Sequence, residues 1–213
     1  MTTFAQLGLS KALIHALAQQ AITVPTAIQT AAIPPLCQGQ DVIGQAHTGS
    51  GKTLAYLCPL FLKIDPSRRE MQALILAPTH ELVMQIYRQA QDLAQNSGLN
   101  IRSINIIGEA NINNQITRLK DKPQLIIGTP GRILDLIQKR KINAQTIKTI
   151  VIDEVDNLLA NTNRQTVLDV IKTTQRDRQL AAFSASLNAA TLTTLQELII
   201  TSPSSDFRVQ HSD

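Results

Sequence analysis

The sequence predicts an α/β fold in which a mainly parallel sheet lies between two layers of helices, as a three-layer sandwich. Two observations support this prediction: short apolar runs alternate with helical patterns, and each helical pattern has one apolar face. Repeated strand, helix, strand units form parallel sheets through right-handed crossovers. The strands are expected at Asp41 to Gln45, Gln72 to Ala77, Ile101 to Ile107, Gln124 to Gly128, Thr149 to Ile152 and Gln179 to Phe183.

Helices are expected between these strands, where apolar residues recur every three or four positions. The apolar stripes are Leu13, Ile14 and Leu17; Leu82, Ile86 and Ala90; Ile133, Leu134 and Ile137; and Leu192, Leu195 and Leu198. Ser10 and Thr129 are the expected N-caps of two helices, and Pro130 occupies the first helical position after Thr129. In a sheet of this kind, ligands bind at the carboxyl ends of the strands.

Size and composition are those of one globular domain. The chain has 213 residues, 43% of them hydrophobic, and a net charge of +4 that suits a polyanionic partner but is also common on ordinary surfaces. The amino-terminal segment lacks the apolar core of a secretory signal, and no apolar run has the length of a membrane-spanning helix. Cys37 and Cys58 lack metal-ligand spacing. We therefore expect a cytoplasmic protein that has reduced cysteines and no membrane partner.

A glycine-rich loop, Ala46 to Thr53, follows the first expected strand and precedes a helix. Glycines allow consecutive backbone N–H groups to point into one concavity, and the following helix adds the positive end of its dipole. Lys52 is expected to reach the β and γ phosphates of ATP, and the Thr53 hydroxyl to bind Mg²⁺. Ala46 stands where the strict pattern has glycine, and a chance glycine-rich turn is the alternative. The other loop residues expected to bind the nucleotide are Thr48, Gly49, Ser50 and Gly51.

An acidic segment, Asp153 to Asp156, ends the expected strand that begins at Thr149. A carboxylate at a strand end can hold Mg²⁺, usually through water, and a neighbouring acid can orient or deprotonate the attacking water. We assign Asp153 to the metal and Glu154 to the water. An isolated acidic cluster is usually a solvated strand end, but the glycine-rich loop favours the catalytic interpretation. The predicted catalytic residues are Lys52, Asp153 and Glu154.

These motifs resemble those of DEAD-box RNA helicases of superfamily 2, with Asp-Glu-Val-Asp in place of Asp-Glu-Ala-Asp. The segment from Val24 to Gln29 resembles the family's Q motif, with Ala21 replacing a glycine and Phe4 upstream. The resemblance covers nearly the whole chain. It implies a RecA-like P-loop domain with ATP and Mg²⁺ as cofactors, to which Thr26, Gln29 and Phe4 contribute. In the family the glutamine recognises adenine and the aromatic residue stacks on it. Taken alone, Gln29 would be a surface residue and Phe4 a core residue.

Two further segments, and a position at Gly108 between them, resemble family motifs that hold RNA phosphates without reading bases. The residues expected to contact RNA are Pro78, Thr79, His80, Gly108, Thr129, Pro130, Gly131 and Arg132. His80 stands where the family has arginine, and Glu109 stands where it usually has a second glycine. Because these changes remove a permanent positive charge and add a negative one, we expect weaker RNA binding than usual. Capped helix starts with no binding role are the alternative.

Ser184, Ala185 and Ser186 resemble the family's Ser-Ala-Thr motif, whose hydroxyls link the hydrolysis site to strand separation. The resemblance implies that Ser184 and Ser186 couple these events through Asp156. A serine in place of threonine keeps the hydroxyl but loses a methyl group, so looser hydrogen bonds to Asp156 are expected. An ordinary serine-rich strand end is the alternative.

The resemblance places a helicase ATP-binding domain at residues 1–209 and the start of a linker at 210–213. In the family this linker leads to a C-terminal RecA-like domain, which is the expected partner in cis. We therefore expect a fragment of an ATP-dependent RNA helicase that hydrolyses ATP weakly or not at all by itself. A free-standing domain is the alternative form. The alternative functions are a nucleotide-gated RNA-binding adaptor with little turnover and a DNA helicase domain.

Overall fold

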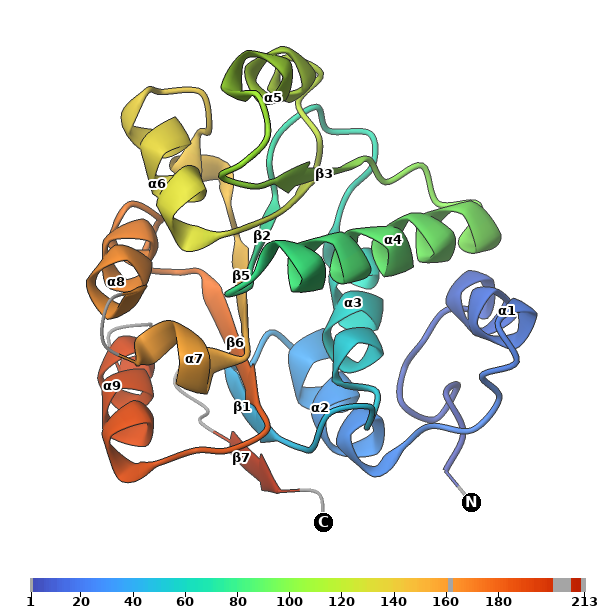
Figure 1. Cartoon of the computed structure of the whole chain (residues 1–213). Coiled ribbons are helices and arrows are strands. Elements are labelled where there is room, and N and C mark those ends of the chain that lie inside the picture. The colour runs from blue at the N-terminus through green and yellow to red at the C-terminus, as the bar shows by residue number, and fades with distance from the viewer. Residues whose placement is uncertain (1, 161–162, 201–207, 212–213) are drawn as a thin grey trace.

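A central parallel sheet runs through the molecule and has helices on both faces (Figure 1). The computed structural model describes residues 2–160, 163–200 and 208–211. The sheet has seven strands in the order β3-β4-β2-β5-β6-β1-β7, and every pairing is parallel. The strands are β1 (Val42–Gln45), β2 (Ala73–Leu76), β3 (Ser103–Ile106), β4 (Leu125–Gly128), β5 (Thr149–Asp153), β6 (Gln179–Ser184) and β7 (Arg208–His211).

Helices form the two outer layers, each over its own hydrophobic cluster. One layer contains α1 (Lys11–Gln19), α2 (Ala27–Cys37), α3 (Lys52–Lys63) and α4 (His80–Ser97). The other contains α5 (Ile112–Leu119), α6 (Pro130–Gln138), α7 (Val155–Leu159), α8 (Arg164–Lys172) and α9 (Ala189–Ile200). A short 3₁₀ helix, η1 (Ala144–Thr146), precedes β5.

The interior strand β2 shows why these runs are apolar throughout. Its four residues are buried, and they alternate between the two layers: Ala73 and Ile75 join the cluster under α1 to α4, whereas Leu74 and Leu76 join the other. Successive strand side chains point to opposite faces, so a strand covered on both sides needs an apolar residue at every position. The three-layer arrangement predicted from the sequence is confirmed.

All six predicted strands form, and each predicted end lies within two residues of the observed one. The predicted helix starts also hold: Ser10 accepts a hydrogen bond from the Leu13 N–H at 3.4 Å. Thr129 is the N-cap of α6, but its hydroxyl makes no capping hydrogen bond, so that cap was only half correct. Strand β7 was not predicted. It pairs with β1, and the proposed boundary at 209/210 falls inside it; residues 212–213 of the expected linker lie outside the described residues.

None of the helices described is both long and apolar enough to cross a membrane. Cys58 is buried, Cys37 is half-buried, and both are free thiols. Burial raises the pKa of the Cys58 thiol to about 12, so this thiol stays protonated and unreactive at neutral pH.

A buried carboxylate, Asp41, lies directly before β1 and is fully shielded from solvent. One of its oxygens accepts the Leu180 N–H at 2.7 Å, while the other has no hydrogen-bond partner among the described residues. Burial raises the pKa of Asp41 to about 6, although the Leu180 N–H and the charges of Arg178 and Lys63 act in the opposite direction. The folded protein therefore binds a proton that the unfolded chain releases near pH 4.

This carboxylate gives a prediction for the pH dependence of stability. Because the folded state holds more protons between about pH 4 and 6, the free energy of unfolding should fall as the pH rises through this window. Relative to Asp41→Asn, the parent should lose about 2–3 kcal/mol between pH 4 and 7, measured by urea unfolding. Asp121→Asn, at an exposed position, is the control and should keep the parent's slope. An unchanged slope in Asp41→Asn would contradict the prediction.

Candidate functional site

The glycine-rich loop joins β1 to α3 at the carboxyl end of the sheet. Gly49 and Gly51 have φ of 84° and 92°, a left-handed conformation in which glycine avoids the steric cost of a side chain. At Gly51 a Cβ atom would also lie 2.5 Å from Gln29 Nε2. Lys52 is the first residue of α3, and its ammonium donates to the carbonyl of His47 at 3.0 Å. The Ser50 hydroxyl is buried without a hydrogen-bond partner among the described residues.

The Q-motif segment packs directly against this loop. Thr26 and Gln29 form a capping box at the start of α2, in which Gln29 Oε1 accepts the Thr26 N–H at 3.0 Å. The other end of the same amide donates to the Gly51 carbonyl at 3.2 Å. Gln29 is therefore not the surface residue that the segment alone would suggest, because it is only 2% exposed. Its recognition of adenine stays a prediction.

Phe4 packs in the hydrophobic core, and its stacking on adenine stays a prediction. Its ring is only 3% exposed and belongs to the hydrophobic cluster that α1 to α4 cover. A ring enclosed in this way has no free face on which a base could stack. The core-packing alternative describes the position of Phe4 in this structure, and stacking on adenine would require the amino-terminal segment to move.

Asp153 ends β5 and faces the glycine-rich loop from the neighbouring part of the sheet. Its carboxylate is 3% exposed and accepts two hydrogen bonds, from the Glu154 N–H at 3.0 Å and from the Tyr56 hydroxyl at 2.8 Å. Burial raises the pKa of Asp153, while Tyr56, the Glu154 N–H and the charge of Lys52 partly offset this rise. A divalent cation would supply the positive charge that this buried oxygen pair lacks.

Tyr56 is a site residue that sequence reasoning missed. Its hydroxyl bonds Asp153, and its ring lies 5.4 Å from the ring of Phe183 on β6, tilted by 52°. Gly44 on β1 makes room for Phe183, since a Cβ there would lie 2.6 Å from that ring. Burial raises the pKa of the Tyr56 phenol well above its usual range, and the Asp153 carboxylate raises it further. Helical spacing could have indicated this role, because Tyr56 lies one turn after Lys52 on α3 and therefore on the same side of the helix.

Replacing Tyr56 with phenylalanine should keep the ring packing and remove one hydrogen bond to a buried carboxylate. We expect a loss of about 1.5–3 kcal/mol in the free energy of unfolding at neutral pH. The loss should grow as the pH rises through the pKa of Asp153, because the phenol stabilises the ionised carboxylate. Urea unfolding across pH measures both effects. The other tyrosine provides the control: Tyr87→Phe removes a hydroxyl bonded to exposed partners and should cost little. Equal losses in the two variants would contradict the prediction.

Glu154 has an unusual backbone conformation for a residue with a side chain. Its φ of 49° and ψ of 52° are left-handed, at a cost of about 1 kcal/mol or more. This conformation separates β5 from α7, for which Glu154 is the N-cap. Its carboxylate accepts a hydrogen bond from Asn157 Nδ2 at 3.0 Å, a contact that was not predicted. The side chain is therefore oriented by a partner one turn along the helix.

The expected coupling contact forms between α7 and the segment after β6. The Ser186 hydroxyl donates to Asp156 at 2.9 Å, so the serine makes this bond at an ordinary distance. Partial burial raises the pKa of Asp156, but the Ser184 and Ser186 hydroxyls and backbone N–H groups outweigh it and hold that pKa below its usual value. Ser184 itself is fully buried.

Two helix starts form the surface expected to hold RNA, at the carboxyl ends of β2 and β4. The Thr79 hydroxyl accepts the Leu82 N–H at 3.2 Å, as a capping residue does. The Thr129 hydroxyl, in contrast, takes no part in capping. Arg132 points to the loop after β3, where its guanidinium donates to the carbonyls of Gly108 and, at 3.2 Å, of Ala110. Of the remaining expected contacts, Pro78 is half-buried, Pro130 is buried and Gly131 is exposed.

The two departures from the family pattern on this surface pair with each other. His80 Nδ1 lies 3.2 Å from the Glu109 carboxylate, and His80 Nε2 accepts the Gly108 N–H at 3.3 Å. The ring proton therefore lies on Nδ1, where it is donated to Glu109. The expected repulsion between Glu109 and phosphate is thus reduced by a local partner. Gln115 completes this loop by donating to the Ile107 carbonyl at 2.8 Å.

The parallel sheet, the glycine-rich loop before α3 and the acidic end of β5 define a RecA-like P-loop domain. A family model described as DEAD/DEAH box helicase matches residues 26–195. The chain therefore belongs to the DEAD/DEAH box helicase family.

Similar proteins of known sequence and structure agree with this assignment. The "Probable ATP-dependent RNA helicase YfmL" of Bacillus subtilis is 45% identical over 174 residues, which cover 82% of this chain and 46% of the relative. The "DEAD-box ATP-dependent RNA helicase CshC" of Bacillus cereus is 46% identical over 175 residues, covering 82% of this chain and 44% of that protein. This chain thus spans less than half the length of these relatives.

Two solved structures share the fold over nearly the whole chain. A DEAD box protein from the hyperthermophile Methanococcus jannaschii matches 98% of this chain and 55% of its own, with a TM-score of 0.88 and 28% identity. Dbp5 from S. cerevisiae, solved bound to RNA and ADP BeF3, matches 100% of this chain and 52% of its own at the same TM-score and identity. In both comparisons this chain matches about half of the length of the solved protein chain.

Proposed function

We propose that this chain is the ATP-binding and RNA-backbone-binding half of an ATP-dependent RNA helicase, and that it works with a C-terminal RecA-like domain. The observation that carries the proposal is the convergence of five motifs at one edge of the sheet. Strands β1, β5 and β6 bring Lys52, Asp153 and Ser184 to this edge, and β2 and β4 bring Thr79 and Thr129 beside them. Partial coverage of the relatives supports the second domain.

The residues at this edge fit a nucleotide with Mg²⁺. The loop offers left-handed glycines, the charge of Lys52, and a buried Ser50 hydroxyl that no other described residue hydrogen-bonds. Opposite them, the pKa of Asp153 is raised by burial, so its carboxylate favours a cation as neighbour. Bound Mg²⁺ would offset charge on the phosphates during transfer. In this proposal Thr53 and Asp153 hold the metal, and Lys52 binds phosphate.

Protein groups around Glu154 would position the attacking water. The left-handed backbone and the bond from Asn157 fix where its carboxylate lies, so that it can accept a proton from water. Movement of α7 would then displace Ser186, because Asp156 lies on this short helix and accepts a hydrogen bond from the Ser186 hydroxyl. This contact supports a role for Ser186 in coupling hydrolysis to RNA, whereas the role of Ser184 rests on the family resemblance.

RNA binding tests the proposal most directly. RNA and DNA of one sequence should compete unequally for the chain, in favour of RNA, if 2′-hydroxyl contacts contribute. Equal competition would favour the DNA-helicase alternative. Hydrolysis that stays absent when a C-terminal domain is supplied would favour the adaptor alternative.

Arg132→Ala should weaken RNA binding to all sequences by a similar factor, roughly tenfold, which is the size of one charge-assisted hydrogen bond. The salt dependence should become shallower by about 0.7–0.9 in slope, because the variant neutralises one phosphate fewer. Fluorescence anisotropy at several salt concentrations measures both.

Arg132→Lys distinguishes binding of an RNA phosphate by Arg132 from stabilisation of the loop at Gly108 and Ala110. Lysine keeps the charge but lacks the two-pronged geometry that reaches both carbonyls. If phosphate contact dominates, Arg132→Lys should retain most of the affinity. A loss as large as that of Arg132→Ala would assign Arg132 to the loop instead.

A further inference from the structure

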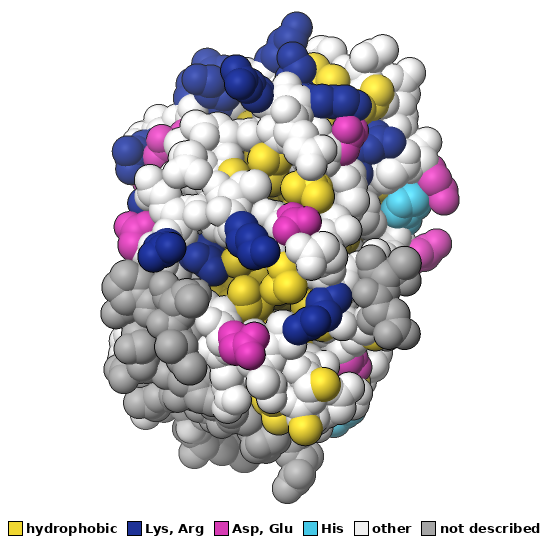
Figure 2. Space-filling view, turned by 90° about the vertical axis from the view of Figure 1, so that its left-hand side faces the viewer, with side chains coloured by type: hydrophobic (Ala, Val, Ile, Leu, Met, Phe, Trp, Pro, Cys, Tyr) yellow, Lys and Arg dark blue, Asp and Glu magenta, His cyan; other side chains and the backbone are white. Residues whose placement is uncertain are grey.

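A basic hollow lies at the opposite end of the sheet from the nucleotide motifs. It is bordered by the segments that precede β2 and η1 and by the carboxyl ends of α5 and α6, and its volume is about 530 Å³. Five cationic side chains line it: Arg69, Lys120, Lys122, Arg140 and Lys141. Figure 2 shows Lys and Arg side chains gathered at the upper end of the face that carries α6 and α8. We call this surface the basic hollow.

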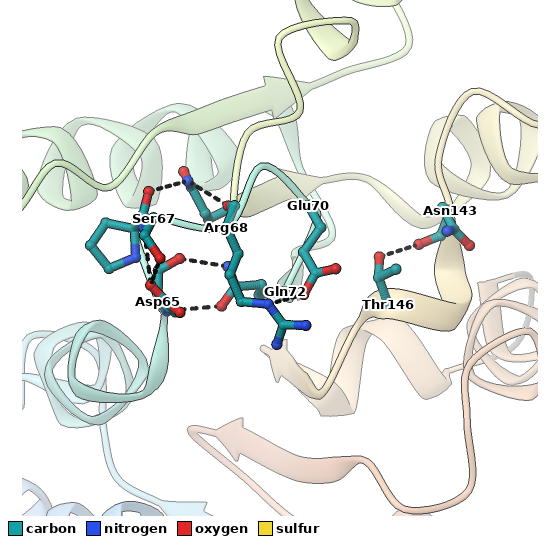
Figure 3. A network of polar contacts seen from close by, with 9 residues as sticks. Asp65, Ser67, Arg68, Glu70, Gln72, Asn143 and Thr146 are labelled. Carbon is teal, nitrogen blue, oxygen red and sulfur yellow. Dashed lines mark hydrogen bonds and ion pairs between the residues drawn. The ribbon is translucent and has the colours of Figure 1, made fainter.

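The cations of the basic hollow have little negative charge to balance them. All five are exposed, and none forms an ion pair with another described residue. Among the described residues that line the hollow, the only acid is Glu70, which pairs with Arg68 at 3.1 Å (Figure 3). Asp121 is exposed beside Lys120 and Lys122 but does not line the hollow. The local field is therefore strongly positive.

A polar network fixes the segment that carries Arg69. Gln72 and Asp65 exchange hydrogen bonds of 2.9 and 2.8 Å across the base of the loop (Figure 3). Gln124 ties the same loop to the segment before β4 by donating to the carbonyls of Pro66 and Arg68. Arg69 thus comes from an anchored loop and lines the hollow together with cations that follow two separate helices.

Helix-end electrostatics explains only part of this arrangement. Four of the cations follow α5 or α6, where positive charge interacts favourably with the helix dipole. Arg69 follows no such helix end. Moreover, Lys122 and Arg140 have φ of 51° and 54°, a left-handed conformation in which glycine or asparagine would be less strained. Cations therefore occupy two positions where the backbone alone would favour other residues.

We propose that the basic hollow is a second RNA-contact surface, which binds phosphates of an RNA segment distinct from the one at the carboxyl end of the sheet. Its cations are long, exposed and spread over three chain segments, which suits an extended phosphate backbone better than a small anion held by rigid donors. Its apolar floor includes Met71 and Leu119, which are buried and so cannot insert into a membrane. The proposal uses the proposed function only in naming RNA as the polyanion.

The test removes charge from the basic hollow without adding strain. The first variant carries Lys122→Gly and Arg140→Gly. Both positions have a left-handed backbone conformation, which glycine adopts without strain, so the melting temperature should not fall. A second variant adds Arg69→Gln, Lys120→Gln and Lys141→Gln. The control, Lys11→Gln with Arg88→Gln, removes two exposed charges on α1 and α4. Binding of a labelled single-stranded oligouridylate is measured over a range of salt, together with ATP binding.

If the basic hollow binds RNA, both variants should bind the oligouridylate more weakly than the control, by about tenfold for the five-site variant. The salt slope should become shallower by about 0.7 for each phosphate that the variant no longer neutralises, and ATP binding should stay at the parent's level. Affinity and slope equal to those of the control would overturn the proposal. So would displacement of the oligouridylate by polyglutamate as effectively as by unlabelled RNA, because the surface would then accept any polyanion.

Failure of this proposal can be told apart from failure of the proposed function. If Arg132→Ala weakens RNA binding and the hollow variants do not, only the second surface is wrong. If the hollow variants weaken binding and Arg132→Ala does not, the RNA contact at the carboxyl end of the sheet is wrong and the basic hollow stands. A parent chain that binds no oligouridylate at low salt would overturn both.

Discussion

Glu154→Gln is expected to lower ATP hydrolysis by about 10²- to 10⁴-fold, the usual size of general-base catalysis, while Mg-ATP binding stays near normal. The amide keeps the shape of the carboxylate, and its oxygen can still accept the hydrogen bond from Asn157. It cannot accept the proton of the attacking water. The measurement is steady-state hydrolysis with a C-terminal helicase domain supplied, beside an equilibrium titration with nucleotide.

Asn157→Ala is the matched control for this variant. It leaves the Glu154 carboxylate in place but removes the side chain that orients it, so hydrolysis should fall by less than in Glu154→Gln. Equal hydrolysis by Glu154→Gln and the parent would remove Glu154 from the water-activating role. Equal losses in Glu154→Gln and Asn157→Ala would show that orientation, and not basicity, is what the carboxylate contributes.

Tethering a C-terminal RecA-like domain after Asp213 should raise ATP hydrolysis by about 10³- to 10⁵-fold and make it dependent on RNA. Phosphoryl transfer depends on positioning and on charge stabilisation, including an arginine finger that another domain or protein commonly supplies. In the proposed site, Lys52 and Asp153 would contact the nucleotide from one side, and the tethered domain would supply groups on the other. A second domain would also couple the two ligands, because each would favour the closed arrangement.

The tethering experiment is judged against the 213-residue chain in the same buffer, with Lys52→Ala in the tethered protein as the control for contaminating activity. RNA-stimulated hydrolysis by the chain alone, at the rate of the tethered protein, would contradict the prediction. Hydrolysis that is fast but independent of RNA would show that the tethered domain completes the nucleotide site without forming the RNA groove.

The fold was predictable because six of the seven described strands are short apolar runs and several helices begin at a capping residue. The strand β7 was missed for a physical reason: Arg208 to His211 contains one apolar residue, Val209, and only its pairing with β1 makes it a strand. Its residues follow a serine-rich stretch with a proline, which is typical of a loop. Tertiary pairing, and not local sequence, determines this element.

The positions of the glycine-rich loop and of the acidic segment were also predictable, because each follows an apolar run that forms a strand. The contacts between segments were not. His80 and Glu109 were each interpreted as a weakness of the RNA surface, but they come from the ends of different strands and form a pair. Tyr56 was overlooked because it lies among apolar residues of a helix. The partner of its hydroxyl, Asp153, is distant in the sequence. Phe4 was assigned by resemblance, and its burial depends on the packing of α1 to α4.

The bond between Tyr56 and Asp153 also makes the site visible to ultraviolet spectroscopy. The chain has no tryptophan and only two tyrosines, so Tyr87→Phe leaves Tyr56 as the sole fluorophore of its class. A phenol that donates to a carboxylate emits weakly, because the excited phenol passes its proton to that acceptor. Any event that draws Asp153 away from Tyr56 should therefore brighten the emission. The protein thus contains its own optical probe, a hydroxyl placed 2.8 Å from the Asp153 carboxylate.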